Sequence, residues 1–420
     1  MNTYPIPLLL VCLLLAAPGQ AADFRAGQVE GLFDLTLAYG LGVRLDDVDK
    51  DLVAIANGGE AKNANKDDGN LNYKDGIISN AVRLNADLTL AWQNLGAYVR
   101  GFAYYDYENE HEDRDRTPLS SDAKDILGKD ADFLDYYLSA SFSAGNIPLF
   151  FRLGDQVVNW GDSNFVRNGI DVINTFDLAA LNQPAVPVRD LRIPQGMLWG
   201  AANVTENIAF EGYYQYEWEP ARLPPVGSYF STNDLIGGDG VNFSMLGAGG
   251  FSDLGTNLDS AFGLPPGTLG FDRDFFRIPG AGTRDASDQG QFGLSVSLIP
   301  EDTNATNFTA YLIRYNSRLP LISGLTADQR AVDQTTQAEV DAQAANLVPA
   351  YESTGLTPEE AASAASRTSE TLTTSQYGNQ SRYVAEYPDD ITMIGLGFNT
   401  ATIKRGLLLA GEYAYHRDFP

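Results

Sequence analysis

The feature that most constrains the fold is a set of long segments in which apolar residues alternate with polar or small ones. The clearest such segment runs from Phe33 to Leu45, and others begin at Val82, Ile208 and Phe292. Alternation with a period of two places one set of side chains on each face of a β-strand. Strands of about ten residues or more are longer than those of most globular proteins and match a tilted transmembrane strand.

We expect about eleven strands, of the length that barrel strands have. They lie at 31–45, 81–92, 97–107, 132–143, 149–158, 197–203, 208–219, 291–299, 307–317, 390–399 and 406–417. Long connections (46–80, 108–131, 159–196, 220–290 and 318–389) alternate strictly with short ones (93–96, 144–148, 204–207, 300–306 and 400–405). This alternation is typical of outer-membrane barrels, which have long extracellular loops and short periplasmic turns.

The predicted fold class is therefore all-β: a transmembrane antiparallel β-barrel of the outer-membrane type, with long extracellular loops and minor helices. A soluble all-β protein is the alternative, but it has no reason to sort its loops by length. One helix is expected after Thr357, where an N-cap is followed by Pro358, Glu359 and Glu360. A second is expected within 326–347. Neither has a wide apolar stripe, so both are expected to decorate a loop.

The amino terminus has the features of a secretory signal. An apolar run from Ile6 to Ala17 precedes small residues that end at Ala21, and it is too short to span a bilayer as a helix. We expect a signal peptide at residues 1–21 and a barrel domain at 22–420, although the first four residues contain no Lys or Arg. The only cysteine, Cys12, falls in the signal, so the mature chain has no disulfide or thiol chemistry. The expected location is the outer membrane of a Gram-negative bacterium.

The charge balance excludes one class of partner and favours another. Asp and Glu number 55 against 28 Lys and Arg, for a formal net charge of -27. Such a chain cannot neutralise a phosphate backbone, so no nucleic-acid partner is expected. Many acidic residues lie in the first two long connections. The expected surroundings are lipopolysaccharide and outer-membrane lipids.

Few residues offer catalytic or metal chemistry. The two histidines, His111 and His416, are far apart, and no Gly-x-Ser-x-Gly motif is present. Asp47, Asp49 and Asp51 begin like a calcium loop, but Leu52 and Gly58 replace the glycine and glutamate that it requires. We therefore expect no enzyme activity, no cofactor and no metal site.

The connection 159–196 is the segment most suited to a role inside the barrel. It mixes apolar and charged residues, whose exposure on a hydrated surface would be costly. We expect it in the barrel mouth or lumen, with an ordinary extracellular turn as the alternative. The candidate solute contacts and constriction residues are Trp160 and Phe165 as apolar groups and Asp162, Arg167, Arg189 and Arg192 as polar groups. The arginines are expected to pair with acids on inner faces of strands such as 208–219.

The same region carries a resemblance to a known family. Residues 156–163, 168–170 and 172–174 resemble the signature of the bacterial "domain of unknown function 1302" family, as do 315–320, 386–391, 397–400 and 411–413. Asp162 stands where the family pattern has Glu. The resemblance implies a proteobacterial outer-membrane β-barrel, encoded near an outer-membrane lipoprotein and RND-type transporters, which are the implied partners. It implies no catalytic residues.

The expected function is a channel or transporter for hydrophobic or aromatic solutes or lipids. A structural or surface-interaction barrel, such as an adhesin or receptor, is the alternative, and a barrel hydrolase is the least favoured. Bacterial barrels normally have an even number of strands, and the family is typically longer than this chain. We therefore expect a fragment that lacks about five closing strands.

Overall fold

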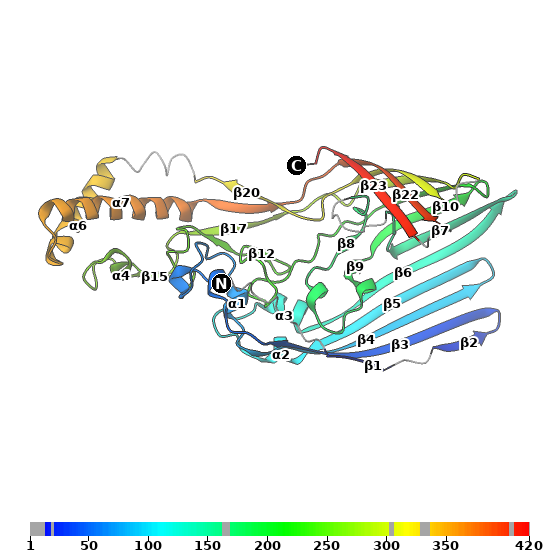
Figure 1. Ribbon diagram of the computed structural model, residues 1–420, viewed down its shortest axis with the longest axis horizontal. Coiled ribbons are helices and arrows are strands. Elements are labelled where there is room, and N and C mark those ends of the chain that lie inside the picture. Colours follow the sequence, from blue (N-terminus) through cyan, green and yellow to red (C-terminus); the bar gives the residue numbers. More distant parts are fainter. Residues whose placement is uncertain are drawn as a thin grey trace.

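The computed structural model describes residues 13–17, 21–161, 169–301, 306–327, 337–402 and 407–419. Its main element is a 13-stranded antiparallel sheet, in the order β1-β3-β4-β5-β6-β7-β10-β11-β18-β19-β22-β23, with β2 also paired to β3 (Figure 1). The bounds are β1 Leu13–Ala17, β2 Ala22–Ala26, β3 Val29–Arg44, β4 Gly76–Trp92, β5 Leu95–Asp106, β6 Lys129–Ala144, β7 Ile147–Gln156, β10 Gln195–Asn203, β11 Ile208–Gln215, β18 Gln291–Leu298, β19 Asn307–Tyr315, β22 Ile391–Thr402 and β23 Leu407–Arg417. Apart from β1 and β2, these strands match the predicted ones one for one, so the all-β prediction is confirmed.

The strand ends differ from the sequence prediction where pairing continues or stops. β4 begins at Gly76 because its ladder with β3 continues past a bulge near Val43. β11 ends at Gln215, short of the predicted residue 219, because β10 supplies its last partner at Met197. β22 reaches Thr402, which pairs with the first residue of β23.

The two edges of the sheet are formed by β1 with β2 and by β23. β1 lies within the predicted signal peptide and pairs with Leu37–Leu41 of β3. No pair among the described residues joins β23 to β1, β2 or β3. None of the described helices is long and apolar enough to cross a membrane.

The sheet is apolar on its exposed face and polar or small on its covered face. In β3, Leu35 and Leu37 are 40% and 50% exposed, whereas Ala38 is buried. In β4, Val82 and Leu84 are exposed, whereas Arg83 and Asn85 are buried. We call the covered face the inner face.

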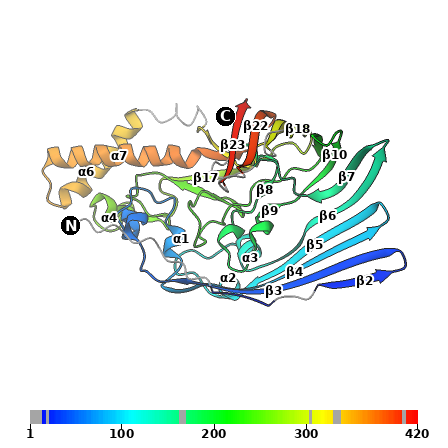
Figure 2. The same cartoon turned by 45° about the vertical axis from the view of Figure 1, so that its right-hand side comes forward.

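The strands form walls of unequal height. β3, β4, β5 and β6 contain 16, 17, 12 and 16 residues, and we call them the tall wall. β7, β10, β11, β18 and β19 contain only 8–10 residues and form the short wall. Figure 2 shows the segment with β8 (Thr175–Phe176) and β9 (Arg192–Ile193) between the two walls.

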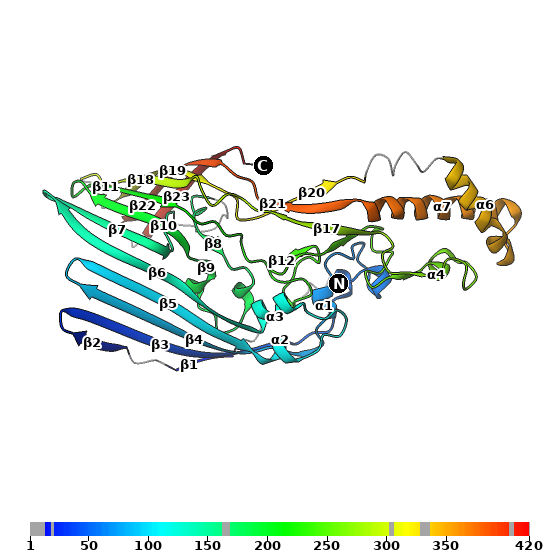
Figure 3. The same ribbon diagram turned by 180° about the vertical axis from the view of Figure 1, so that it is seen from behind.

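The long connections contain all the described helices and the smaller sheets. These elements are α1 Asp68–Leu71, α2 Tyr107–His111, α3 Ser121–Leu127, α4 Leu258–Phe262, α6 Gln337–Ser353, α7 Pro358–Gln380, β12 Ile236–Gly237, β13 Gly240–Val241, β14 Phe243–Met245, β15 Thr256–Asn257, β16 Phe271–Asp272, β17 Arg277–Arg284, β20 Leu321–Leu325 and β21 Arg382–Glu386. Short 3-10 helices lie at 50–52, 55–57, 180–182 and 188–191. A four-stranded sheet, β14-β17-β21-β20, leads from the main sheet to α6 and α7, which project at the far end of the molecule (Figures 1 and 3).

The predicted helix after Thr357 is confirmed as α7. Thr357 Oγ1 accepts from the Glu360 amide while the Glu360 carboxylate accepts from the Thr357 amide, which completes a capping box. The second predicted helix is present as α6, whose described residues are Gln337–Ser353, so it extends past the expected end at residue 347; residues 328–336 lie outside the described residues. The helices are more than loop decoration, because Leu347, Tyr351 and Leu372 pack in a buried cluster with Phe275 and Phe276.

Candidate functional site

Residues 157–194 connect β7 to β10, and we call them the inner loop; its described parts, 157–161 and 169–194, lie against the inner face of the sheet. Val158, Trp160, Ile170, Val172 and Ile173 of this loop are buried. They form one cluster with inner-face side chains of four strands, namely Met197, Tyr213, Ile313, Tyr315, Ile391 and Met393. The predicted internal position of the described part of this loop agrees with this packing.

The apolar half of the inner loop is held by a side-chain clamp. Asn174 Oδ1 accepts from the Val158 amide at 3.1 Å, and Asn174 Nδ2 donates to the Val158 carbonyl at 2.8 Å. The side-chain amide of Asn174 thereby satisfies both backbone groups of Val158, which lies beyond the end of β7 and has no strand partner among the described residues. Gly161, at φ +81°, lies so close to Ile170 that a Cβ would be 2.9 Å from the Ile170 Cβ.

Trp160 is the largest side chain that the inner loop places on the short wall. Its indole nitrogen donates to Glu211 Oε2 at 2.9 Å. Its ring lies 5.3 Å from that of Tyr213 and 5.7 Å from that of Tyr311. The absence of a side chain at Gly293 makes room for it, since a Cβ there would be 2.7 Å from the indole. Trp160 also lines a polar cavity of about 230 Å³ near the short turns. Its other lining residues include Ser295, Ser297, Thr309, Asn399 and Glu412.

The other predicted contact residues have different outcomes. Asp162, Phe165 and Arg167 lie outside the described residues. Arg189 pairs with Asp87 of β4 at 2.9 Å, and Arg192 pairs with Asp171 at 2.8 Å. Arg189 thus pairs with an acid on the inner face of a strand, as expected, but the strand is β4 rather than 208–219. Arg192 pairs with an acid of the loop itself, so the expected strand partner is wrong for Arg192.

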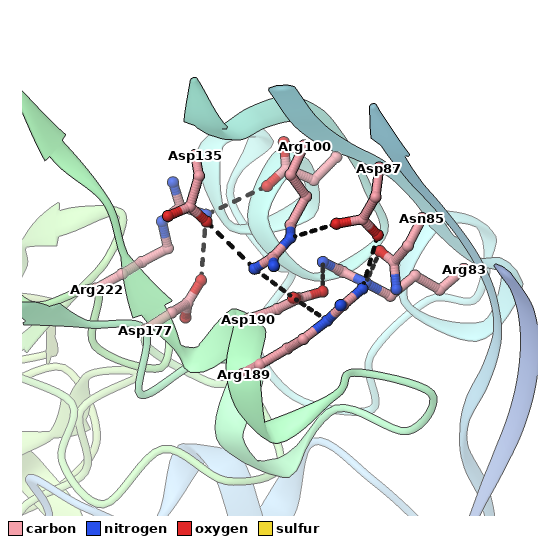
Figure 4. A network of polar contacts seen from close by, with 10 residues as sticks. Arg83, Asn85, Asp87, Arg100, Asp135, Asp177, Arg189, Asp190 and Arg222 are labelled. Carbon is pink, nitrogen blue, oxygen red and sulfur yellow. Dashed lines mark hydrogen bonds and ion pairs between the residues drawn. The ribbon is translucent and has the colours of Figure 1, made fainter. Parts of the chain in front are cut away.

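A buried charge network joins the second half of the inner loop to the tall wall (Figure 4). At its centre is Asp190, whose side chain is 0% exposed and lies 3.0 Å from Arg83 Nη2 and 3.7 Å from Arg100 Nη1. Arg100 also bridges Asp87 at 2.9 Å and Asp135 at 3.2 Å. Each of these charges is buried with an opposite charge, which is the condition for burying a charge at all.

A cavity of about 200 Å³ lies beside this network, where the inner loop meets β6. Two guanidinium groups, of Arg83 and Arg222, face seven carboxylates in its lining: Asp130, Asp132, Asp155, Asp177, Asp190, Glu217 and Glu219. Burial raises the pKa of Asp177, and the Arg222 charge partly opposes this. Burial and the Glu217 charge raise the pKa of Glu219. The excess of carboxylates makes the cavity electrostatically suited to cations.

The family model described as "Protein of unknown function (DUF1302)" matches residues 6–420. The chain belongs to the DUF1302 family. Comparison with curated proteins and with solved structures found no significant match. The resemblance that we identified from the motifs is thus confirmed over nearly the whole chain.

In this DUF1302 chain, sequence reasoning missed the network and the cavity. A signal is present in the sequence, because the alternation that begins at Val82 places Arg83 and Asp87 on the polar face of the predicted strand 81–92. Period-two alternation gives the face of a strand but not its partners across the interior. The contacts of Arg83 and Arg100 with Asp190 therefore became visible only in the structure.

A second group of buried acids lies in the long connections. Asp67, Asp68 and Asp253 offer oxygen atoms within 4.8 Å of one another, and Arg116 pairs with Asp68 at 3.0 Å and also with Asp253. Burial and the Asp253 charge raise the pKa of Asp68 to about 7 despite Arg116. Burial and the Asp68 charge raise the pKa of neighbouring Asp234 to about 8. The segment that begins like a calcium loop is separate from this group. Its Asp47, Asp49 and Asp51 are not buried, and Asp49 caps a 3-10 helix.

Proposed function

We propose that the chain is an outer-membrane β-barrel transporter whose lumen is narrowed by the inner loop. The observation that carries the proposal is the inverted polarity of the sheet, which is apolar outside and polar inside. A soluble protein rarely exposes so large a contiguous apolar surface, whereas the lipid-facing side of a barrel requires it.

The distribution of exposed aromatic residues supports the proposal. Near the short turns, the exposed aromatic side chains are mainly Phe and Trp: Phe33, Trp92, Phe142, Phe210, Phe308 and Phe398. Near the long connections they are mainly Tyr: Tyr39, Tyr105, Tyr136, Tyr214, Tyr413 and Tyr415. Leucines such as Leu37, Leu138 and Leu294 lie between the two groups. Two aromatic girdles around an aliphatic band are typical of membrane barrels.

The interior supports transport rather than a purely structural barrel. The described parts of the inner loop do not fill the interior, since they line two cavities, one with Asp177 and Asp190 and the other with Trp160. We propose hydrophobic or aromatic solutes or lipids as the cargo, with lipopolysaccharide and outer-membrane lipids around the barrel. An outer-membrane lipoprotein and an RND-type transporter are the proposed partners.

Planar-bilayer conductance of the full chain tests the constriction. Trp160→Ala removes the ring between the buried cluster and the polar cavity, so single-channel conductance is expected to rise. Trp92→Ala is the matched control, because Trp92 is exposed at the end of β4. Equal conductance in wild type and Trp160→Ala, with both proteins inserted, would contradict the constriction.

A surface-interaction function is the second candidate, because α6 and α7 project far beyond the main sheet (Figure 3). Leu325 of β20 and Arg382 of β21 are direct partners, so an Asn-Gly turn can replace 326–381 as a two-residue hairpin. The transporter proposal expects solute flux to survive this deletion. Loss of adhesion with unchanged flux would assign an interaction role to the projection.

A further inference from the structure

The amino-terminal part of β6 has a strand partner on one side only. Its pairs with β5 run from Tyr105↔Lys129 to Leu95↔Ala140. Its pairs with β7 begin only at Tyr136↔Asp155. Because the chain leaves the sheet after Gln156 and returns at β10, no described strand pairs with Lys129–Asp135 on that side. The wall therefore has a gap beside Lys129–Asp135, where β6 continues past the ends of β7 and β10.

A bulge arranges the side chains of β6 at this gap. Val99 pairs with Tyr136 and Gly101 with Phe133, so Leu134 and Asp135 together face Arg100. Leu134 and Asp135 are buried, whereas Phe133 and Tyr136 are 66% and 45% exposed. The centroids of the two exposed rings are 6.4 Å apart. Bulges often redirect side chains beside functional sites, and this one places an aromatic pair on the outer face at the gap.

The acidic cavity is lined by these same two residues. Its lining includes Asp190 deep in the interior and also Phe133 and Tyr136 at the outer face. Pro194, just before β10, lines it from the far side of the gap. One cavity at this gap is therefore lined by residues of the interior and by residues whose side chains lie on the outer face.

The charged groups that line the cavity favour a cationic ligand. Arg83 pairs with Asp190, and Arg222 pairs with Asp130 and Asp177, so both cavity guanidinium groups are already neutralised. Asp132, Asp155, Glu217 and Glu219 form no ion pair within the described part of the chain. The ring of Tyr104 also lines the cavity, whereas the ring of Phe102 already holds the Arg83 guanidinium at 3.9 Å from its centroid.

We propose that this gap is a lateral portal through which an amphiphile with a cationic ammonium head group and an apolar tail passes between the cavity and the membrane. The head group lies among the unpaired carboxylates, and the tail passes Phe133 and Tyr136 into the lipid. The proposal rests on the transporter function and names its substrate class and its route.

Binding of matched amphiphiles tests the head-group selectivity. We would measure the affinity of the full chain in lipid nanodiscs for decyltrimethylammonium, decanol and decanoate by calorimetry. The ammonium compound is expected to bind at least about tenfold tighter than the other two. The double variant Asp132→Asn, Glu219→Gln should remove this preference while leaving decanol binding unchanged. Equal binding of decanoate, or a preference that survives the double variant, would overturn the cationic specificity.

A cysteine block tests the route. In a Cys12→Ser background, Phe133→Cys is modified with a bulky maleimide, and Leu138→Cys is the control on the same face of β6. The two native side chains are 66% and 64% exposed, but Leu138 lies where β5 and β7 both pair. Modification at 133 alone should cut transfer of the ammonium amphiphile into the vesicle membrane at least about fivefold.

Ion conductance measured in the same vesicles separates the two proposals. If the vesicles conduct ions but modification at 133 does not slow amphiphile transfer, the portal is overturned and the transporter proposal stands. The absence of both conductance and transfer would overturn both proposals.

Discussion

The tall wall and the short wall use their inner faces differently. The tall wall presents Arg83, Asp87, Arg100 and Asp135, which form a buried charge network with the second half of the inner loop. The short wall presents Met197, Tyr213 and Ile313, which pack against its first half. One loop therefore carries an apolar half and a charged half, each matched to the wall it contacts. The comparison shows that the loop is a built part of the interior rather than a chance insertion.

The largest expected effect concerns the charged half. Asp190→Ala leaves the Arg83 side chain, which is 4% exposed, without its partner. Loss of one member of a buried ion pair costs about 3–5 kcal/mol, measured as a shift in unfolding of the inserted protein by urea. The double variant Arg83→Met, Asp190→Leu should recover most of this loss. A double variant as unstable as the single one would show that the network does more than neutralise charge.

The next effect contrasts the two faces of β3. Leu37 is 50% exposed on the outer face, and Thr36 lies on the inner face. Leu37→Arg is expected to cost about 2–4 kcal/mol if this face contacts lipid, whereas Thr36→Arg should be tolerated. Heat-modifiable migration on gels provides the measurement. Greater damage from Thr36→Arg would reverse the assignment of faces.

A smaller effect tests the packing of the apolar half. A Cβ at Gly293 would lie 2.7 Å from the Trp160 ring and 2.4 Å from the Tyr213 ring, so Gly293→Ala should cost about 1–3 kcal/mol. At Gly212, on the paired strand but the outer face, a Cβ would meet only Leu294 at 3.1 Å and a backbone oxygen at 3.4 Å. Equal urea stability of the two alanine variants would argue against a tightly packed Trp160.

A pH-dependent effect concerns the acidic group in the long connections. Because burial raises the pKa of Asp234 to about 8, the folded state holds this proton more strongly than the unfolded chain. Its contribution is fully present below the unfolded pKa of about 4 and is lost as the pH rises toward 8. Asp234→Asn, which carries no titrating group at this position, should therefore gain stability relative to wild type as the pH rises from 5 to 9. A difference between the two proteins that does not change with pH would refute the shift.

The strands were predictable and the interior was not, for physical reasons. Alternation and turn spacing are local, so every main-sheet strand after β2 was located from its own residues. The partners of Arg189 depend on segments about a hundred residues apart, and no local pattern specifies them. The parallel pairing of β17 with β21 likewise joins distant parts of the chain. The gap beside β6 follows from where β7 stops, and sequence analysis placed that end two residues too late.

The central claim is that the apolar face of both walls contacts lipid. Nitroxide labels at Leu84 and Leu294, one on each wall, would be compared with labels at their inner-face neighbours Asn85 and Ser295. In reconstituted protein, we predict that collisions with oxygen dominate at 84 and 294, while the water-soluble nickel complex is preferred at 295. Asn85 and Ser295 are both buried, but Ser295 lines the polar cavity whereas Asn85 accepts from Arg83 in the charge network, so position 85 should be shielded from both reagents. Strong collisions with the nickel complex at 84 and 294 would contradict a membrane-embedded barrel.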